Sequence, residues 1–134
     1  MHEFLHPKGW KPAIGYSNGV AATGRMVFTG GMVGWTGNCV FETDDFAGQA
    51  AQALRNIVAV LAEAGARPEH IVRLTWYVTD KAEYLASLKA LGTAYKGVIG
   101  AHYPAMALVQ VVALVEDAAK VEIEATAIIP EACA

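Results

Sequence analysis

The segment 105–114 constrains the fold more than any other, because it reads as a β-strand that is apolar on both faces. Strand side chains alternate between the two faces of a sheet, so every second residue shares a face. One face would carry only alanine and valine: Ala105, Ala107, Val109, Val111 and Ala113. The other would carry larger and mostly apolar side chains: Met106, Leu108, Gln110, Val112 and Leu114. Helices of the same chain cover one face, so the pattern predicts that a second copy of the chain covers the other.

The last predicted strand, 120–129, combines an apolar face with two carboxylates. The apolar face would hold the alternate residues Val121, Ile123, Ala125, Ala127 and Ile129. Glu122 and Glu124 then point to the opposite face, toward the predicted contact between copies. A carboxylate there must be paired, hydrogen-bonded or beside a water-filled cleft, because burying it alone is costly. Glu122 is therefore a candidate site residue, and a solvated position at the rim is the alternative for both glutamates.

The rest of the chain alternates predicted strands and helices. Further strands are expected at 3–5, 16–22, 25–33 and 70–79, with the second and third joined as a hairpin at Thr23-Gly24. One helix is expected from a cap at Thr43, Asp44 or Asp45 to a stop at Gly65, and a second from Asp80 to Gly100. The order β-β-α-β-α-β-β predicts a single α+β domain over 1–134, in which one mixed sheet carries two helices on one face.

Composition narrows the classes of function. Apolar residues make up 54% of the 134 and charged residues only 17%, which is more apolar than an ordinary soluble domain and agrees with a buried subunit contact. No apolar run is long enough to cross a bilayer, and the first residues lack the features of a signal peptide, so a cytoplasmic protein without a membrane partner is expected. The net charge is −3 and lysine and arginine form no cluster, so no nucleic-acid partner is expected.

Neither the cysteines nor the histidines form a readable metal or disulfide motif. Cys39 and Cys133 are far apart in the sequence. The four histidines, His2, His6, His70 and His102, show no ligand spacing. We therefore expect a reduced protein that needs no metal and no cofactor.

Short motifs along nearly the whole chain resemble those of one family. They are Gly-Tyr-Ser at 15–17, Phe-Thr-Gly-Gly-Met at 28–32, Gln49 with Ala-Leu-Arg-Asn at 53–56, Tyr-Pro-Ala at 103–105 and Val-Glu-Ile-Glu-Ala at 121–125. In this order and spacing the chain is similar to the RidA/YjgF family of imine and enamine deaminases, also described as L-PSP endoribonucleases. The resemblance implies a chorismate-mutase-like fold and a homotrimer with a ligand cleft at each subunit boundary.

The resemblance also assigns roles to individual residues. Glu122 would be catalytic, holding or polarising the attacking water, while Tyr16 would wall the cleft and Gly31 would offer backbone groups to the ligand. Deaminating members carry an arginine that clamps the substrate carboxylate, and Met106 stands at that position here. Because a bidentate arginine–carboxylate pair in a partly dry cleft contributes about 2–4 kcal/mol, its loss weakens capture of a carboxylate roughly 30- to 1000-fold.

Other positions also depart from the family pattern. Ala107 and Leu108 replace residues that often carry a hydroxyl or thiol group, and Gly92 replaces a helix asparagine. Together with Met106, Leu108 would form an apolar wall of the substrate-binding site. Trp35, in a glycine-rich loop, would either cover the cleft or pack against its own loop.

Two functions remain open at this point. The first is a small-molecule hydrolase of the imine or enamine type that does not act on ordinary 2-imino acids. The second is a trimer that binds a metabolite without turnover, which the lost arginine, hydroxyl and asparagine favour. Contributions of His102, Lys11 and Glu124 to the site are also left open. Ribonuclease activity is the least favoured function, because the chain lacks a basic patch.

Overall fold

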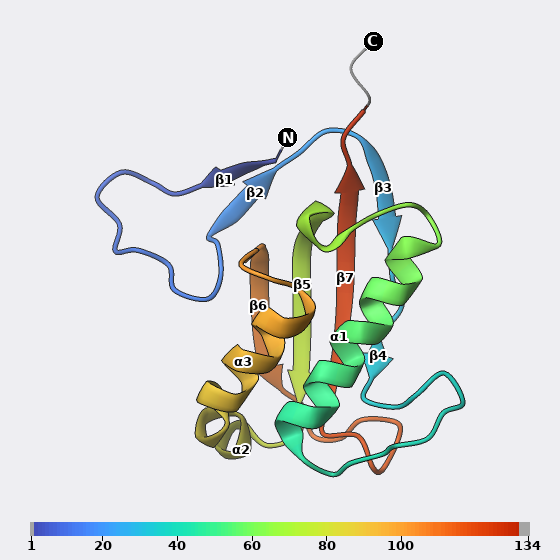
Figure 1. Ribbon diagram of the computed structural model, residues 1–134. Helices are drawn as coiled ribbons and strands as arrows, with labels where there is room; N and C mark the ends of the chain where they lie inside the picture. The colour runs from blue at the N-terminus through green and yellow to red at the C-terminus, as the bar shows by residue number, and fades with distance from the viewer. Residues whose placement is uncertain (1, 132–134) are drawn as a thin grey trace.

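The computed structural model describes residues 2–131, so Cys133 lies outside the described residues (Figure 1). A small antiparallel sheet pairs β1 (Glu3–Leu5) with β2 (Gly19–Ala21). The main sheet has the strand order β3 (Arg25–Phe28), β7 (Val121–Ile129), β5 (Ile71–Val78) and β6 (Ala105–Gln110), and β4 (Met32–Val33) also pairs with β7. Only β5 and β6 run parallel, so the sheet is mixed, as predicted.

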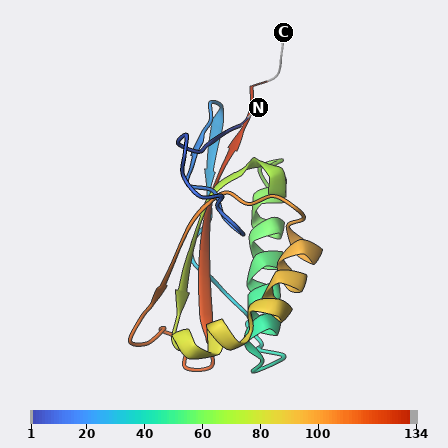
Figure 2. The same ribbon diagram turned by 90° about the vertical axis from the view of Figure 1, so that its left-hand side faces the viewer.

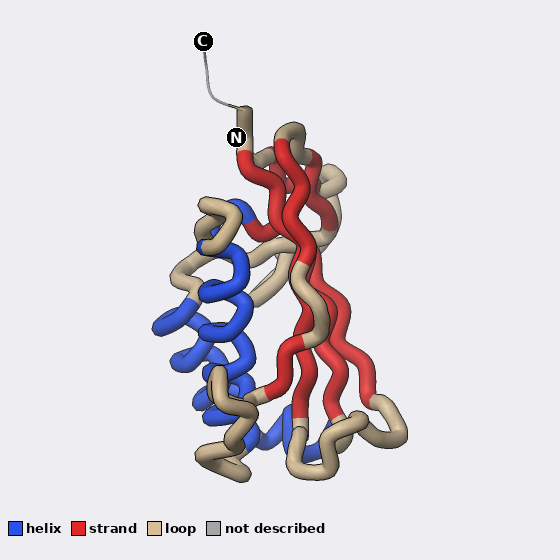
Figure 3. Tube along the Cα trace, turned by 90° about the vertical axis from the view of Figure 1, so that its right-hand side faces the viewer, coloured by secondary structure: helices blue, strands red, loops and turns tan. Residues whose placement is uncertain are grey.

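All the helices of the described chain that pack on the main sheet lie on one of its faces, which confirms the predicted layer arrangement. They are α1 (Phe46–Ala62) and α3 (Leu88–Val98), with the short α2 (Lys81–Ala86) and a 3-10 turn at Pro68–His70. Figure 2 shows α1 and α3 side by side on this face, and Figure 3 shows that the opposite face carries no helix. The core between the layers is built from Leu54, Ile57, Leu61, Leu74 and Ile123, all fully buried. No helix within residues 2–131 is long and apolar enough to span a membrane.

Helix α1 forms where the apolar periodicity and the caps agree. The side chain of Asp45 accepts a hydrogen bond from the backbone N–H of Gly48, which satisfies one of the free donors at the helix start. Gly65 adopts a φ of 79°, and the N–H of Ala66 then closes the helix end on the carbonyl of Leu61. Both ends lie within a few residues of the prediction.

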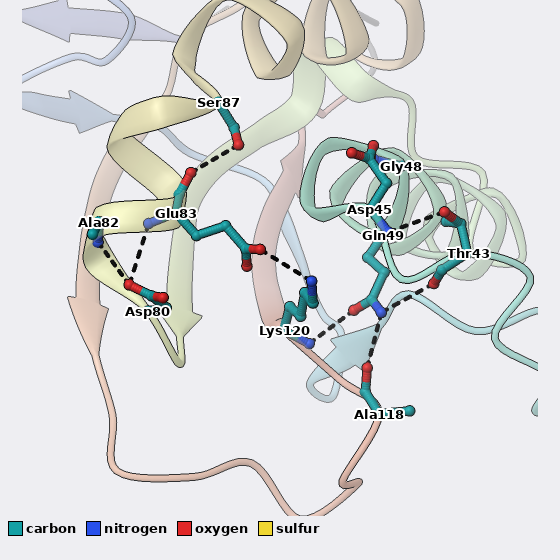
Figure 4. A network of polar contacts seen from close by, with 10 residues as sticks. All are labelled: Thr43, Asp45, Gly48, Gln49, Asp80, Ala82, Glu83, Ser87, Ala118 and Lys120. Carbon is teal, nitrogen blue, oxygen red and sulfur yellow. Dashed lines mark hydrogen bonds and ion pairs between the residues drawn. The ribbon is translucent and has the colours of Figure 1, made fainter.

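Gln49, fully buried on α1, ties the helix to the start of β7 (Figure 4). Its amide nitrogen donates to the carbonyls of Thr43 (3.1 Å) and Ala118 (2.9 Å), and its carbonyl accepts from the N–H of Lys120 (2.8 Å). The polar atoms of this fully buried side chain are thereby satisfied. Because Lys120 directly precedes β7, this contact fixes the position from which Glu122 projects.

Asn56, seven residues further along the same helix, holds the other flank of β7. Its amide nitrogen donates to the carbonyls of Val33 (3.1 Å) and Trp35 (2.7 Å), at and just after β4. Residues seven apart share a helix face, so both amides point to the sheet. Asn56 therefore ties the end of β4 and the segment that follows it to α1.

The predicted second helix is wrong in one respect, because it is interrupted at Ser87. Asp80 caps α2 through the N–H groups of Ala82 and Glu83, as its position in the sequence indicates (Figure 4). At Ser87 the hydroxyl donates to the carbonyl of Glu83 at 2.7 Å, and the backbone leaves the helical conformation with a ψ of 8°. Such local side-chain bonding competes with the helix ladder, and α3 begins one residue later.

The predicted hairpin of 16–22 with 25–33 is also wrong. The first of these segments keeps only β2, which pairs with β1, and β3 pairs with β7 instead. Gly24 does not close a hairpin: a Cβ there would lie 2.0 Å from the carbonyl oxygen of Ile129, so the chain passes against the end of β7. The short strand expected at 3–5 is confirmed.

Strand β6 ends at Gln110, four residues before its predicted end. The N–H of Val111 donates to the carbonyl of Val78, the last residue of the neighbouring β5, and no strand partner of the described chain continues beyond it. The side chain of Gln110 accepts from the N–H of Lys81 at 2.7 Å and ties the strand end to α2. Residues 111–120 therefore form a loop back to β7.

Candidate functional site

The predicted site residues of β6 and β7 lie on opposite faces of the main sheet. Buried residues alternate along β7, and Glu122 and Glu124 point to the face that carries no helix, as predicted. On β5, Leu74 and Trp76 are buried under the helices, and their partners across the parallel ladder are Met106 and Leu108. Within one copy of the chain, Glu122 and Met106 are therefore separated by the sheet itself.

Glu122 is brought together with Gly31. A Cβ atom built on Gly31 would lie 2.2 Å from Oε2 of Glu122 and 2.8 Å from its Cδ, so the carboxylate rests directly against the glycine backbone. Only a residue without a side chain permits this approach. A Cβ atom built on the neighbouring Gly30 would have no other atom within 4 Å, so the close contact is specific to Gly31.

Glu124 is held by Tyr77 on the same helix-free face. The Tyr77 hydroxyl donates to Oε1 of Glu124 at 2.9 Å, and this hydrogen bond, with the negative charge behind it, raises the pKa of Tyr77. Tyr77 is also the cross-strand partner of Glu122. Glu124 is thus engaged within its own copy, and no ion pair to Glu122 or Glu124 forms among residues 2–131.

On the helix-covered side, a pocket of about 510 Å³ contains the other predicted residues. Tyr16, Met106 and Leu108 all line it, so the structure brings these three together. The remaining lining residues come from the loop before Tyr16, from β5, α2 and α3, and from the segment just before β6. They are Ile14, Gly15, Trp76, Tyr84, Leu88, Leu91, Gly92, Tyr95 and Tyr103. A volume of this size suits a small organic ligand.

Tyr16 reaches this pocket because its loop adds to the edge of β6. The N–H of Ser17 donates to the carbonyl of Pro104 at 3.0 Å, and the Ser17 hydroxyl donates to the carbonyl of Tyr103. Ser17 also forms a parallel bridge with Ala105. The ring of Tyr16, 45% exposed, is thereby placed at the pocket mouth beside the Tyr-Pro-Ala motif.

The aromatic lining was not recognised from the sequence. Tyr84 and Tyr95 fit the apolar stripe of a helix, a pattern that predicts core residues. Tyr95 is indeed buried, which raises its pKa, yet one side of it faces the pocket. Tyr103 stacks on Tyr95, although the sequence marked it only as part of a motif. No local sequence pattern indicates that α2 and α3, the loop that holds Tyr16, and β6 together enclose one pocket.

Trp35, His102 and Lys11, whose roles were left open, do not line the pocket that contains Tyr16, Met106 and Leu108. Trp35 packs against Phe41, a residue of the same loop, with ring centroids 5.7 Å apart. His102 donates from Nε2 to the carbonyl of Ile71 at 2.7 Å, a structural contact, and Lys11 is exposed.

A larger and more open hollow contains none of the predicted site residues. It measures about 880 Å³ and lies beside the loops 41–44 and 112–120. Gln49 and Lys120, which border it, are engaged in the contacts that hold β7. Within residues 2–131, no group of three or more histidine, cysteine or acidic side chains is arranged to hold a metal ion.

Comparisons with known proteins identify the family of the chain. The family model described as endoribonuclease L-PSP matches residues 8–129. A 2-iminobutanoate/2-iminopropanoate deaminase from Salmonella typhimurium is 35% identical over 117 residues, which cover 87% of this chain and 89% of that protein. Protein DfrA from Myxococcus xanthus is 33% identical over 130 residues, which cover 96% of this chain and 93% of that protein.

A solved structure of similar sequence confirms the fold. The crystal structure of YyfB from Yersinia pestis, a protein of unknown function in the conserved Rid family, superposes with a TM-score of 0.85 at 32% identity. The match covers 96% of this chain and 98% of that one. The predicted α+β, chorismate-mutase-like arrangement is therefore confirmed.

Proposed function

This chain belongs to the RidA/YjgF family, the family of the endoribonuclease L-PSP model, and we propose that it hydrolyses small imines or enamines in a cleft between neighbouring copies. The observation that carries the proposal is the division of the site residues. Gly31 and Glu122 form a carboxylate–backbone pair on one face of the sheet, and Tyr16, Met106 and Leu108 line a pocket on the other.

Two half-sites on opposite faces are what a shared cleft between copies requires. We propose a cyclic trimer in which the helix-free face of one copy meets the pocket mouth of the next. That face exposes large apolar side chains on the two outer strands of this order, β3 and β6: Met26 (57%), Phe28 (63%) and Val109 (46%). Such a surface favours burial against a second copy.

Glu122 supplies the acid and base steps of the proposed reaction. It takes a proton from the water whose oxygen attacks the C=N carbon, and returns that proton to nitrogen, giving a carbinolamine. A second transfer, from the carbinolamine hydroxyl to nitrogen, breaks the C–N bond, releases ammonia or an amine, and leaves a carbonyl. The backbone at Gly31 keeps the carboxylate in place throughout, and Tyr16 walls the cleft.

Met106 sets the proposed substrate range. An arginine clamp for a carboxylate is absent at this position, and a methionine offers a flexible apolar wall instead. Ordinary 2-imino acids therefore bind poorly, and imines without a carboxylate next to the reacting carbon are preferred.

The test compares in-situ generated imines with and without a carboxylate, following loss of the C=N absorbance. We expect faster decay only of the carboxylate-free imines with the wild-type chain. Met106→Arg should gain activity on amino-acid-derived imines, whereas Met106→Gln, polar but uncharged, should not. Acceleration of neither class of imine by the wild-type chain would overturn the hydrolase. A folded, oligomeric Met106→Arg chain that gains nothing would overturn the argument about the clamp.

A second function, binding without turnover, is favoured by the residues at two further family positions. Ala107 offers no hydroxyl group, and Gly92, which lines the pocket, offers no amide. A protein of this kind would carry or sense a metabolite in the same cleft. A ligand that raises the melting temperature and is recovered unchanged after long incubation, with no imine hydrolysed, would decide for it.

A further inference from the structure

The pocket on the helix-covered side is uncharged and largely aromatic. None of its twelve lining residues carries an ionisable acid or base that is charged at neutral pH. Five are aromatic: Tyr16, Trp76, Tyr84, Tyr95 and Tyr103. A charged group entering this space would lose its water without gaining a partner from the same copy, which is unfavourable.

Three of the five aromatic rings pack on one another. Tyr103 stacks on Tyr95 with centroids 5.3 Å apart and an angle of 12° between the planes, and Trp76 lies 6.5 Å from Tyr95, tilted by 31°. Flat ring surfaces favour a flat ligand, because aromatic rings interact best in offset stacks or edge-to-face pairs. Met106 adds a thioether, which makes favourable contacts with ring edges.

The two most buried polar ends add no charge to the pocket. The Tyr95 hydroxyl donates to the carbonyl of His102 at 2.6 Å, so it is already engaged. The indole N–H of Trp76 is buried and finds no hydrogen-bond partner within residues 2–131.

From these contacts we propose that the pocket binds a planar, uncharged aromatic group, so that the substrate or ligand of this chain is a neutral aryl compound. The inference rests on the proposed function only in taking this pocket as the ligand half of the site. It goes beyond that function by naming the chemical class that Met106, Leu108 and the tyrosine rings select.

The test uses three probes of nearly equal size with the full-length chain. They are 2-naphthol, its charged counterpart 2-naphthoate, and its saturated, puckered counterpart decahydro-2-naphthol. Binding is followed by chemical-shift titration at pH 7. We expect 2-naphthol to bind at least tenfold more tightly than either counterpart, because only it is both flat and uncharged.

Gly92 provides a variant that fills the pocket without disturbing the fold. A Cβ at Gly92 meets no atom within 4 Å, and the residue lies inside α3, where a side chain is better tolerated than glycine. Gly92→Phe should weaken 2-naphthol at least tenfold, whereas the control Gly97→Ala, in the same helix but outside this pocket, should change it less than threefold. Met106→Arg gives a second variant, which should reverse the preference between 2-naphthol and 2-naphthoate.

The outcomes separate this inference from the proposed hydrolase. If 2-naphthoate or decahydro-2-naphthol binds as tightly as 2-naphthol, or if Gly92→Phe binds 2-naphthol like the wild-type chain, the inference is overturned. If carboxylate-free aliphatic imines are hydrolysed while 2-naphthol does not bind, the inference fails and the hydrolase stands. If 2-naphthol binds as expected and no imine is hydrolysed, the inference stands and the hydrolase fails.

Discussion

The contact between Gly31 and Glu122 gives the sharpest prediction. In Gly31→Ala the new methyl group would lie 2.2 Å from Oε2, 2.8 Å from Cδ and 3.1 Å from Cγ of Glu122. Carbon and oxygen atoms in van der Waals contact lie about 3.5 Å apart, so the carboxylate must withdraw by about 1 Å. A misplacement of about 1 Å can cost on the order of 100-fold in rate. We therefore expect imine hydrolysis to fall roughly 100-fold in Gly31→Ala.

Stability should barely change in the same variant. The clash involves the end of a flexible side chain, and Gly31 does not adopt a positive φ, so alanine fits its backbone. Replacing glycine by alanine at a compatible position lowers the conformational entropy of the unfolded chain and stabilises a protein by about 0.4–1 kcal/mol. This gain offsets part of the cost of moving Glu122.

The adjacent glycine is the matched control. A Cβ at Gly30 meets no atom within 4 Å, so Gly30→Ala should keep both activity and melting temperature. The assay is the initial rate of C=N loss, with the thermal unfolding curve of each variant recorded alongside. The reasoning is refuted if folded Gly31→Ala hydrolyses imines at the wild-type rate, or if Gly30→Ala loses as much activity.

Three further predictions concern stability. Gly34→Ala places a methyl group 2.6 Å from the backbone of Gln49 and should lower the free energy of unfolding by at least about 1–3 kcal/mol, measured by urea titration. The control is Gly37→Ala, whose new methyl group meets no atom within 4 Å, so its free energy of unfolding should not change. Gln49→Leu removes three hydrogen bonds made by a fully buried side chain, each worth about 0.5–1.5 kcal/mol, so the urea midpoint should fall clearly. Burial lowers the pKa of His70 below 6.5, so the unfolded chain binds the proton more readily and the free energy of unfolding should fall as the pH drops below 6.5. In His70→Asn this free energy should fall less between pH 8 and 5.5. The same pH dependence of stability in the variant and the wild-type chain would contradict the prediction.

Local pattern was sufficient for the elements whose partners lie nearby in the sequence. The periodicity of α1, its acidic cap and Gly65 predicted both helix ends closely. The period-two alternation of β7 predicted that Glu122 and Glu124 share the helix-free face. These signals depend on backbone geometry alone, so they need no knowledge of what packs against them.

Errors arose where the pairing is non-local. The predicted hairpin failed because β3 pairs with β7, about a hundred residues away, and the close passage of Gly24 against Ile129 looks in the sequence like an ordinary turn. The interruption at Ser87 depends on one hydroxyl finding the carbonyl of Glu83. The aromatic pocket could not be predicted for the same reason, because Tyr84 and Tyr103 meet only after the sheet has formed.

The separation of Glu122 from Met106 leads to a final prediction about assembly. A single ligand cannot touch both faces of one sheet, because the backbone lies between them. If both residues act on one molecule, they must belong to different copies. Two variants, one altered in the carboxylate and one in the pocket, should then regain activity when they assemble with each other. Glu122→Gln keeps an intact pocket, and Gly92→Phe keeps an intact carboxylate.

Refolding the two inactive variants together in equal amounts tests this directly. In a cyclic assembly with one site at each boundary, about one boundary in four joins an intact carboxylate to an intact pocket. Mixed oligomers should therefore regain about a quarter of the wild-type rate, while each variant refolded alone stays inactive. A mixture that shows only the sum of its parents, despite forming mixed oligomers, would mean that Glu122 and the pocket do not serve the same site. The aromatic pocket and the carboxylate would then need separate explanations.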